Sequence, residues 1–363
     1  MQMSIVTCKV IEKQPLVSIC VPVHNAEKTI VETLHTMLGQ TYRNMEILVV
    51  DNASTDKTPV LLLEFNDPRL KIYRNEINIG AEGNFSKAVH LASGEYIAIF
   101  HADDLYLPEM VEKQVAAMQK YPSAGAVFTL ANYINSRGEI IGESHFPFEL
   151  KSVEIHSFSE IFEATLKNMN ILMCPSAMVK GKLYKELMPF DMDRFGTSSD
   201  LDMWLRILET HPILILKEKL MSYRISINHW SYQLNQSRTK RADFFEVMDY
   251  YLLKYSGIKF SAEALDKYKL AENIDRVRCA VFYLVKNEPS EAKKLLKESF
   301  STKIFWGFGG SSGGIRAHKV LICWLFAVIS VLAINLGVDR YFVKSLQRFM
   351  QKGGRLMSKR GSI

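Results

Sequence analysis

Short hydrophobic runs recur along the first 120 residues, separated by segments in which apolar residues stand three or four positions apart. The runs are rich in β-branched residues and predict buried strands at Val17–Val23, Met45–Val50, Leu70–Arg74 and Tyr96–Phe100. The intervening segments predict helices at Glu27–Leu38, from a cap at Ser54 or Thr55 to about Phe65, at Glu82–Ala92 and at Glu109–Lys120. This alternation predicts an α/β fold with a mostly parallel sheet flanked by helices.

The pattern loosens after residue 121. We expect strands and helices at Ala124–Leu130, Phe158–Lys167, Ser176–Val179, Asp200–Leu208, Ile213–Leu216 and Lys219–Arg224, with hairpins inside 131–155. Helical periodicity returns from Arg241 to about Lys297, and Ser256-Gly257 should divide it into two to four helices. The expected organisation is an α/β domain, a helical extension, a Gly-rich linker and a tail, over residues 15–235, 241–300, 301–318 and 319–363.

Acidic residues stand where two of the predicted strands end. Asp51 follows the second strand, and Asp103 and Asp104 follow the fourth. Parallel strands share a direction, so these acids should meet at one edge, where open α/β sheets bind ligands. A divalent cation would relieve the repulsion between adjacent carboxylates, and Mg²⁺ and Mn²⁺ prefer oxygen ligands. The alternative is a solvated turn that caps the next helix.

A sheet of this kind also suits nicotinamide-dependent dehydrogenases. The first strand, however, leads into PVHNAEKT (Pro22–Thr29) rather than into a G-x-G-x-x-G turn. No Walker A lysine loop is present either. A dinucleotide site or a P-loop is therefore not expected.

Length and composition indicate a globular protein. The chain has 363 residues and 48% hydrophobic residues, enough for one large domain with an appendage or for two domains. The five cysteines are scattered without metal-type spacing, which favours reduced thiols in a cytosolic setting. Residues 1–16 lack the apolar segment of a signal peptide, so none is expected.

The positive net charge belongs to the tail. Residues 316–363 hold nine Lys/Arg and one acid, whereas the remainder holds 36 basic and 38 acidic residues. Val320–Val338 carries no charge and, at about 1.5 Å per residue, nearly spans a hydrocarbon core of roughly 30 Å. Seven Lys/Arg follow it, and such flanks prefer the cytoplasm.

We therefore expect attachment to a membrane surface, with a second, amphipathic helix in YFVKSLQRFM (Tyr341–Met350). A single span and a buried core or oligomer helix are the alternatives. The apolar run within the basic tail favours lipid over nucleic acid as its partner.

Five stretches, in this order, carry a family resemblance: VSICVPVHNAEKTI (Val17–Ile30), EILVVDNASTDKT (Glu46–Thr58), NIG (Asn78–Gly80), SGEYIAIFHADDLYLP (Ser93–Pro108) and SDLDMWLRI (Ser199–Ile207). Together they resemble the family 2 glycosyltransferases with the GT-A fold. The resemblance covers roughly Pro15 to Ser231. It implies a Rossmann-like nucleotide-binding sheet.

The resemblance also implies roles for individual residues. The nucleotide would be held by Pro22, Val23, His24, Asn25, Asp51, Asn78 and Asp103. Asp104, with Asp103, would bind Mn²⁺ or Mg²⁺ beside the donor diphosphate. Asp200 would be the catalytic base that deprotonates the acceptor hydroxyl. From the residues alone, Asp200 could instead be a helix cap, since it stands at the start of a predicted helix.

The chain departs from the family pattern at several positions. His101 stands where the family often has an acid, and His24 where it often has Tyr. Gly83 replaces a frequent Arg, Ser199 the usual Glu, and Ser226 the His of a late Tyr-Arg-x-His motif. These departures leave the identity of the sugar donor open.

The resemblance implies an inverting, metal-dependent glycosyltransferase that uses a nucleotide sugar, most readily a UDP-sugar. The expected acceptor is a lipid-linked glycan in surface polysaccharide synthesis, reached from the cytoplasmic face of the cell's inner membrane. A sugar nucleotidyltransferase is one alternative, but its Gly-rich activating loop is absent. A non-catalytic, nucleotide-sugar-binding membrane scaffold is the other.

Overall fold

The computed structural model describes residues 14–150, 155–225, 238–300, 328–332 and 334. Within them, ten strands form one sheet in the order β3-β2-β1-β4-β9-β6-β10-β5, with β7 beside β6 and β8 beside β10. The strands are β1 (Val17–Val23), β2 (Met45–Asp51), β3 (Leu70–Arg74), β4 (Tyr96–Ile99), β5 (Leu105–Tyr106), β6 (Ala126–Ile134), β7 (Ile140–Glu143), β8 (Ile155–His156), β9 (Met178–Lys180) and β10 (Ile213–Arg224).

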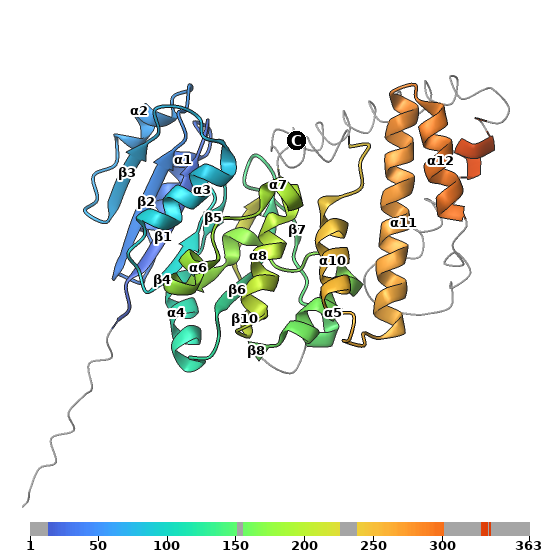
Figure 1. Cartoon of the computed structure of the whole chain (residues 1–363). Helices are drawn as coiled ribbons and strands as arrows, with labels where there is room; N and C mark the ends of the chain where they lie inside the picture. The colour runs from blue at the N-terminus through green and yellow to red at the C-terminus, as the bar shows by residue number, and fades with distance from the viewer. Residues whose placement is uncertain (1–13, 151–154, 226–237, 301–327, 333, 335–363) are drawn as a thin grey trace, which may run out of the picture.

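The first half of the sheet is parallel, as predicted. β1 pairs in parallel with both β2 and β4, and β2 pairs in parallel with β3. The second half is mixed, because β9 runs antiparallel between β4 and β6, while β6 and β10 are parallel. The predicted α/β fold with helices around a central sheet is confirmed (Figure 1).

Two local predictions were wrong. The two closing strands are one strand, β10, whose pairing with β6 is irregular between Leu216 and Lys219. The second helix is α2 (Thr58–Leu62), which has Lys57 rather than Ser54 or Thr55 at its cap position. The Ser54 hydroxyl instead accepts a hydrogen bond from the Asn25 amide, so it ties two loops together.

The helices that flank the sheet are α1 (Ile30–Leu38), α3 (Gly80–Leu91), α4 (Met110–Lys120), α5 (Phe158–Asn168), α6 (Gly181–Leu187), α7 (Met192–Phe195) and α8 (Ser199–Leu208). Short 3₁₀ turns lie at Phe148–Leu150, Cys174–Ser176 and Gly196–Ser198. Alternate strand residues face opposite sides. Val49 belongs to the core cluster that includes residues of α1 and α4, whereas Val50 belongs to the cluster that includes residues of α3, α5 and α8.

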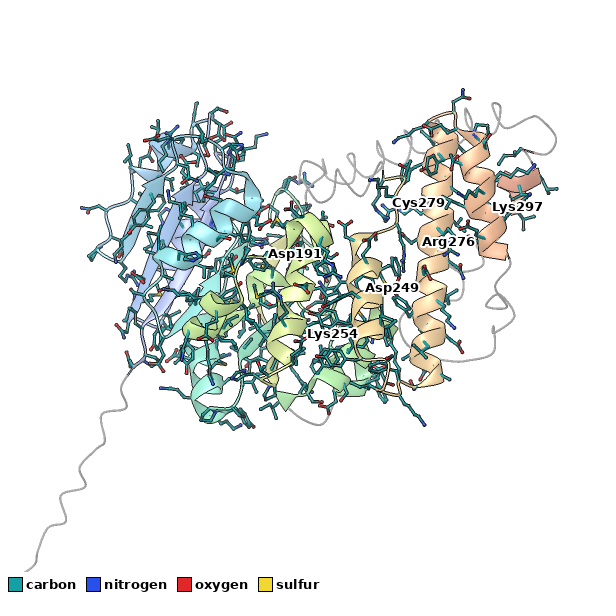
Figure 2. The ribbon with its side chains drawn as sticks, in the orientation of Figure 1. Asp191, Asp249, Lys254, Arg276, Cys279 and Lys297 are labelled. Carbon is teal, nitrogen blue, oxygen red and sulfur yellow. The ribbon has the colours of Figure 1, made fainter. Side chains whose placement is uncertain are left out.

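The predicted helical extension consists of α10 (Asp243–Lys254), α11 (Ala262–Val285) and α12 (Pro289–Phe300). α11 and α12 lie side by side at the end of the molecule opposite β3 (Figure 1). α10 carries Asp249 and Lys254, which Figure 2 labels. Lys254 pairs with Glu209 at 2.6 Å, and the Tyr268 hydroxyl of α11 donates to Asp249 at 2.6 Å. The first contact joins the extension to the end of α8, and the second joins α10 to α11 within the extension.

Most of the predicted tail lies outside the described residues. Residues 328–332 and 334 are helical, and Val331 and Ile334 pack against the α11–α12 pair. These contacts are the ones expected if this part of the tail is a buried core helix, which was one of the alternatives. Among the helices that the structure describes, none is both long enough and apolar enough to cross a membrane. The described cysteines, Cys20, Cys174 and Cys279, are free and buried.

Candidate functional site

The predicted metal motif forms a tight loop between two strands. The chain leaves β4 at Ile99, passes through residues 101–104, and enters β5, whose Tyr106 lies opposite Met221 of β10. The Tyr106 ring stacks on Phe100 at 3.8 Å between centroids, and its hydroxyl accepts a 2.7 Å hydrogen bond from the His101 amide. The loop is therefore fixed at both ends. β5 was not predicted, because two residues carry no periodicity.

Asp104 is buried inside this loop. Its Oδ1 accepts a 2.7 Å hydrogen bond from the Arg224 amide, while its equally buried Oδ2 has no hydrogen-bond donor within the described chain. Burial, and then the neighbouring charge of Asp103, raises the pKa of Asp104 well above its usual range. A buried carboxylate oxygen without a donor suits a cation, which would remove the cost of ionisation.

The site offers further ligand atoms. One ligand atom from each of His101, Asp103 and Asp104 can be chosen so that all lie within 4.8 Å of one another. Nδ1 of His101 lies 3.6 Å from Oδ2 of Asp104. The residues therefore fit a divalent cation, and the metal-binding role of Asp103 and Asp104 stays a prediction.

Arg224 holds this loop from the other side, a role that the sequence analysis did not assign. Its side chain is 5% exposed. Nε donates to the Asp103 carbonyl at 2.7 Å, Nη2 to Glu32 at 2.8 Å, and Nη1 to the carbonyls of Asn135 and Ser136 at 3.2 and 3.3 Å. The signals in the sequence were an arginine at the end of a predicted strand and its place in the late Tyr-Arg-x-His motif.

The loop after β1 is joined to the loop after β2. Asn25 adopts a left-handed conformation, with φ of 51°, which Asn tolerates better than most residues. Its Oδ1 accepts a 2.8 Å hydrogen bond from the Thr55 amide. Nδ1 of His24 lies 2.9 Å from the Asn52 carbonyl, and Nε2 of His24 lies 3.4 Å from Nδ2 of Asn78. The fold thus brings three of the predicted nucleotide-binding residues together.

Asp51 lies at the end of β2 and is 1% exposed. Its Oδ1 accepts a 3.0 Å hydrogen bond from the Ser54 amide. Its Oδ2 has no hydrogen-bond donor in the part of the chain that is described, although Nε of Arg74 lies 3.5 Å away. One carboxylate oxygen thus keeps its capacity to accept a hydrogen bond.

A cleft of about 1070 Å³ opens between these loops. Its walls come mainly from residues 22–29, 101–103, 170–175, 196–200 and 223–224. The predicted site residues that line it are Pro22, His24, Asn25, Asp103 and Asp200. Val23, Asp51, Asn78 and Asp104 are not part of its lining. The volume suits a ligand of the size of a nucleotide sugar.

Asp200 enters this cleft from the first turn of α8. Ser198 occupies the cap position, so Asp200 is not the cap residue, although its Oδ1 accepts a 2.8 Å hydrogen bond from the Leu201 amide. Burial raises the pKa of Asp200 to about 6, partly offset by that hydrogen bond. A carboxylate with this pKa can accept a proton near neutral pH.

The Tyr223 side chain lies within electrostatic range of Asp103 and Asp104 and also of Asp200. Burial raises its pKa, and the charges of Asp104, Asp103 and Asp200 raise it further. All three carboxylates therefore lie within electrostatic range of one side chain in the cleft. Asp200 itself is held firmly, because Trp204 of the same helix is buried edge-on against Phe128 at 5.1 Å.

Comparison with known proteins identifies the family. The sequence model of the family described as "Glycosyl transferase family 2" matches residues 18–188. The glucosyltransferase WfgD of Escherichia coli, described as a UDP-Glc:alpha-D-GlcNAc-diphosphoundecaprenol beta-1,3-glucosyltransferase, is 32% identical over 262 residues, which cover 69% of this chain and 96% of WfgD. The uncharacterized glycosyltransferase MJ1057 of Methanocaldococcus jannaschii is also 32% identical, over 66% of this chain and 79% of its own length.

Solved structures share the fold. Staphylococcus aureus TarS, in complex with UDP-GlcNAc, has a TM-score of 0.53 and 18% identity, covering 89% of this chain and 92% of the TarS chain. The Pyrobaculum calidifontis mannosyltransferase PcManGT, in complex with GDP-Man and Mn²⁺, has a TM-score of 0.51 and 18% identity, covering 94% and 89%. These likenesses confirm the predicted GT-A architecture. With the family match and the relatives above, they establish that this chain belongs to glycosyltransferase family 2 and is a glycosyltransferase.

Proposed function

We propose that the protein is an inverting, metal-dependent glycosyltransferase that moves a sugar from a UDP-sugar to a hydroxyl of a lipid-linked glycan. The observation that carries this proposal is the position of Asp200. It lines the same cleft as Asp103, and the pKa of its carboxyl is about 6. A base poised near neutral pH beside a cation-binding loop is what direct sugar transfer needs.

The donor nucleotide would lie across the ends of β1 and β2. His24, Asn25 and Asn78 would contact it from the joined loops, with Pro22, Val23 and Asp103 shaping its surroundings. Oδ2 of Asp51 would accept a hydrogen bond from an N–H of the base. A UDP-sugar is favoured because WfgD, 32% identical, is described as using UDP-Glc, and TarS has been solved with UDP-GlcNAc.

Asp104 and Asp103 would hold Mn²⁺ or Mg²⁺. When bound, the ion offsets the negative charge on the departing nucleoside diphosphate. Arg224 keeps both acids in place through its amide and guanidinium groups. The Mn²⁺ bound in PcManGT supports a divalent ion, although that protein shares only 18% identity.

Asp200 would accept the proton of the acceptor hydroxyl. As the proton leaves, the acceptor oxygen forms a bond to the anomeric carbon from the face opposite the diphosphate. The bond from the anomeric carbon to the diphosphate oxygen breaks, and the nucleoside diphosphate departs with that electron pair. One displacement of this kind inverts the anomeric configuration.

A lipid-linked acceptor in surface polysaccharide synthesis is favoured by two observations. The substrate in WfgD's description is a diphosphoundecaprenol lipid, and TuaG of Bacillus subtilis, 29% identical, is described as a putative teichuronic acid biosynthesis glycosyltransferase. The tail also carries a net charge of +8 over residues 316–363. We propose that this tail attaches the enzyme to the cytoplasmic face of the membrane, where it would meet anionic lipid.

The test measures release of nucleoside diphosphate from a panel of nucleotide sugars. The acceptors are membrane extract and GlcNAc-diphosphoundecaprenol, with and without Mn²⁺. Metal-dependent turnover with one donor, lost in Asp104→Ala and Asp200→Asn, is expected. Nucleotide binding without turnover on any acceptor would favour the scaffold alternative. Turnover that survives both substitutions would show that the metal site and the base are elsewhere.

Membrane attachment is tested by sedimentation with vesicles of phosphatidylcholine and phosphatidylserine. Wild-type protein should bind and be partly released by salt, because Lys and Arg near the surface contribute about 1 kcal/mol each. Replacing Lys344, Arg348, Lys352 and Arg355 with Gln should weaken binding to anionic vesicles. Equal binding by the wild type and this variant would argue against the basic tail as the anchor.

A further inference from the structure

An imidazole accompanies the two carboxylates of the 101–104 loop. Nδ1 of His101 lies 3.6 Å from Oδ2 of Asp104, and ligand atoms of both residues lie within 4.8 Å of one from Asp103. That Asp104 oxygen is buried and has no hydrogen-bond donor among the described residues. The loop therefore offers nitrogen as well as oxygen to an ion placed there.

The orientation of His101 is set by its surroundings. Its amide donates to the Tyr106 hydroxyl, whose ring is stacked on Phe100. Its ring meets Phe85 at 6.2 Å between centroids, with the planes at 80°. The side chain is 21% exposed and lines the cleft, so it is held in place but still reachable by an ion.

We propose that His101 is a nitrogen ligand of the metal in this cleft and that it makes the site prefer Mn²⁺ and later transition ions to Mg²⁺. Imidazole suits transition ions, whereas Mg²⁺ takes oxygen ligands with little tolerance for other geometries. This inference rests on the metal site of the proposed function. It goes further by naming a third ligand and the class of metal that the ligand selects.

The nitrogen ligand can be observed directly. Mn²⁺ is added to the full-length protein, alone and with UDP, and its pulsed electron paramagnetic resonance spectrum is recorded. Coupling of the Mn²⁺ electrons to an imidazole ¹⁴N is expected in the wild type and should disappear in His101→Gln and His101→Asp. It should persist in His24→Gln, which removes the other imidazole that lines the cleft among the described residues, and in His90→Gln, which alters an exposed residue.

The two hypotheses can fail separately. Binding of Mn²⁺ without ¹⁴N coupling would overturn the role of His101 while leaving the metal site in place. Coupling lost only in His24→Gln would move the nitrogen ligand to His24. If neither Mn²⁺ alone nor Mn²⁺ with UDP binds, the metal site of the proposed function falls as well, and His101 is then only the ion-pair partner of Asp104.

Metal preference provides a second readout. Competition between Mn²⁺ and Mg²⁺, measured by calorimetry, should show that the ratio of the two affinities falls about tenfold in His101→Asp. With three carboxylates and no imidazole, the loop of His101→Asp would bind Mg²⁺ more tightly relative to Mn²⁺ than the wild-type loop does. An unchanged ratio in both His101 variants would contradict the proposed selectivity.

Discussion

The backbone amide of Arg224 donates a 2.7 Å hydrogen bond to Oδ1 of Asp104, although the two residues are 120 positions apart. The antiparallel pairing of β5 with β10 brings them together, since Ser222 lies opposite Leu105. The amide satisfies one oxygen of a buried carboxylate and leaves the other facing His101. The end of β10 therefore determines which oxygen is presented to an ion.

Arg224→Ala should lower both stability and metal affinity. The amide bond to Asp104 survives, but the carbonyls of Asp103, Asn135 and Ser136 lose their donor. Unfolding in urea should show a loss of about 1–3 kcal/mol, the usual range for losing hydrogen bonds from a charged donor. Titration with Mn²⁺ and UDP should show weaker binding.

The exposed Arg43 provides the matched control for that experiment. Arg43→Ala should change stability by no more than about 0.5 kcal/mol. If Arg224→Ala behaves like Arg43→Ala in both measurements, the guanidinium contacts do not support the loop.

Asp200→Asn should slow transfer strongly and spare donor binding. The amide keeps the shape of the side chain but cannot accept a proton. The turnover number should fall by about 10²–10⁴-fold, the usual contribution of a general base. Calorimetry should give an unchanged dissociation constant for UDP with Mn²⁺. A weaker affinity with little change in turnover would instead place Asp200 in donor binding.

The pH profile gives an independent test of Asp200. Because burial raises its pKa to about 6, the base is protonated, and therefore inactive, at lower pH. In the wild type, kcat/KM should fall about tenfold for each pH unit below that value. The residual activity of Asp200→Asn should lack this acid limb. An identical limb in the variant would assign the inflection to another group.

Asp104→Asn should stabilise the protein when no metal is present. Burial and the charge of Asp103 make ionisation of Asp104 costly, as the raised pKa shows, and Asn Oδ1 can still accept from the Arg224 amide. The gain should be about 0.5–2 kcal/mol, as is common when a functional site loses a destabilising group. Thermal unfolding should show a higher Tm without metal and no further rise with Mn²⁺ and UDP. A lower Tm than that of the wild type would contradict the assumed cost of the charge.

Glu46 is a buried acid that we expect to stabilise the fold through its hydrogen bonds. Burial alone would raise its pKa, but hydrogen bonds from Lys71, Ser18 and Ser93 outweigh burial and lower the pKa to about 2. Glu46→Gln should cost about 1–3 kcal/mol at pH 7. Because the folded pKa lies below the unfolded one, this contribution is present above about pH 4.5 and is lost as the pH falls toward 2.

Urea unfolding at pH 7 and pH 3 checks that dependence. The difference between wild type and Glu46→Gln should be smaller at pH 3. The exposed Glu95, replaced by Gln, should show almost no difference at either pH. If the free energies of unfolding of wild type and Glu46→Gln differ by the same amount at pH 7 and pH 3, the charge of Glu46 is not what stabilises the β1–β2–α3 junction.

The sequence by itself determined the frame of the molecule. Runs such as Met45–Val50 are apolar on both faces, as strands covered by helices on both sides must be, so the alternation of elements and the parallel half of the sheet could be predicted. The acids after β2 and β4 could be placed at one edge for the same reason, since parallel strands end on the same side. The family resemblance singled out Asp200 as a candidate site residue, and its side chain lines the cleft.

Only the tertiary structure decided how those residues work together. The two-residue β5, the contacts of Arg224 and the Asp104 oxygen that lacks a hydrogen-bond donor among the described residues depend on one strand pairing. That pairing joins segments more than 100 residues apart, and local periodicity carries no record of it. The pKa of Asp200 is likewise a property of its burial, which is set by neighbours from distant parts of the chain. Periodicity reports how each segment divides between core and solvent, whereas the chemistry of this cleft depends on which segments meet there.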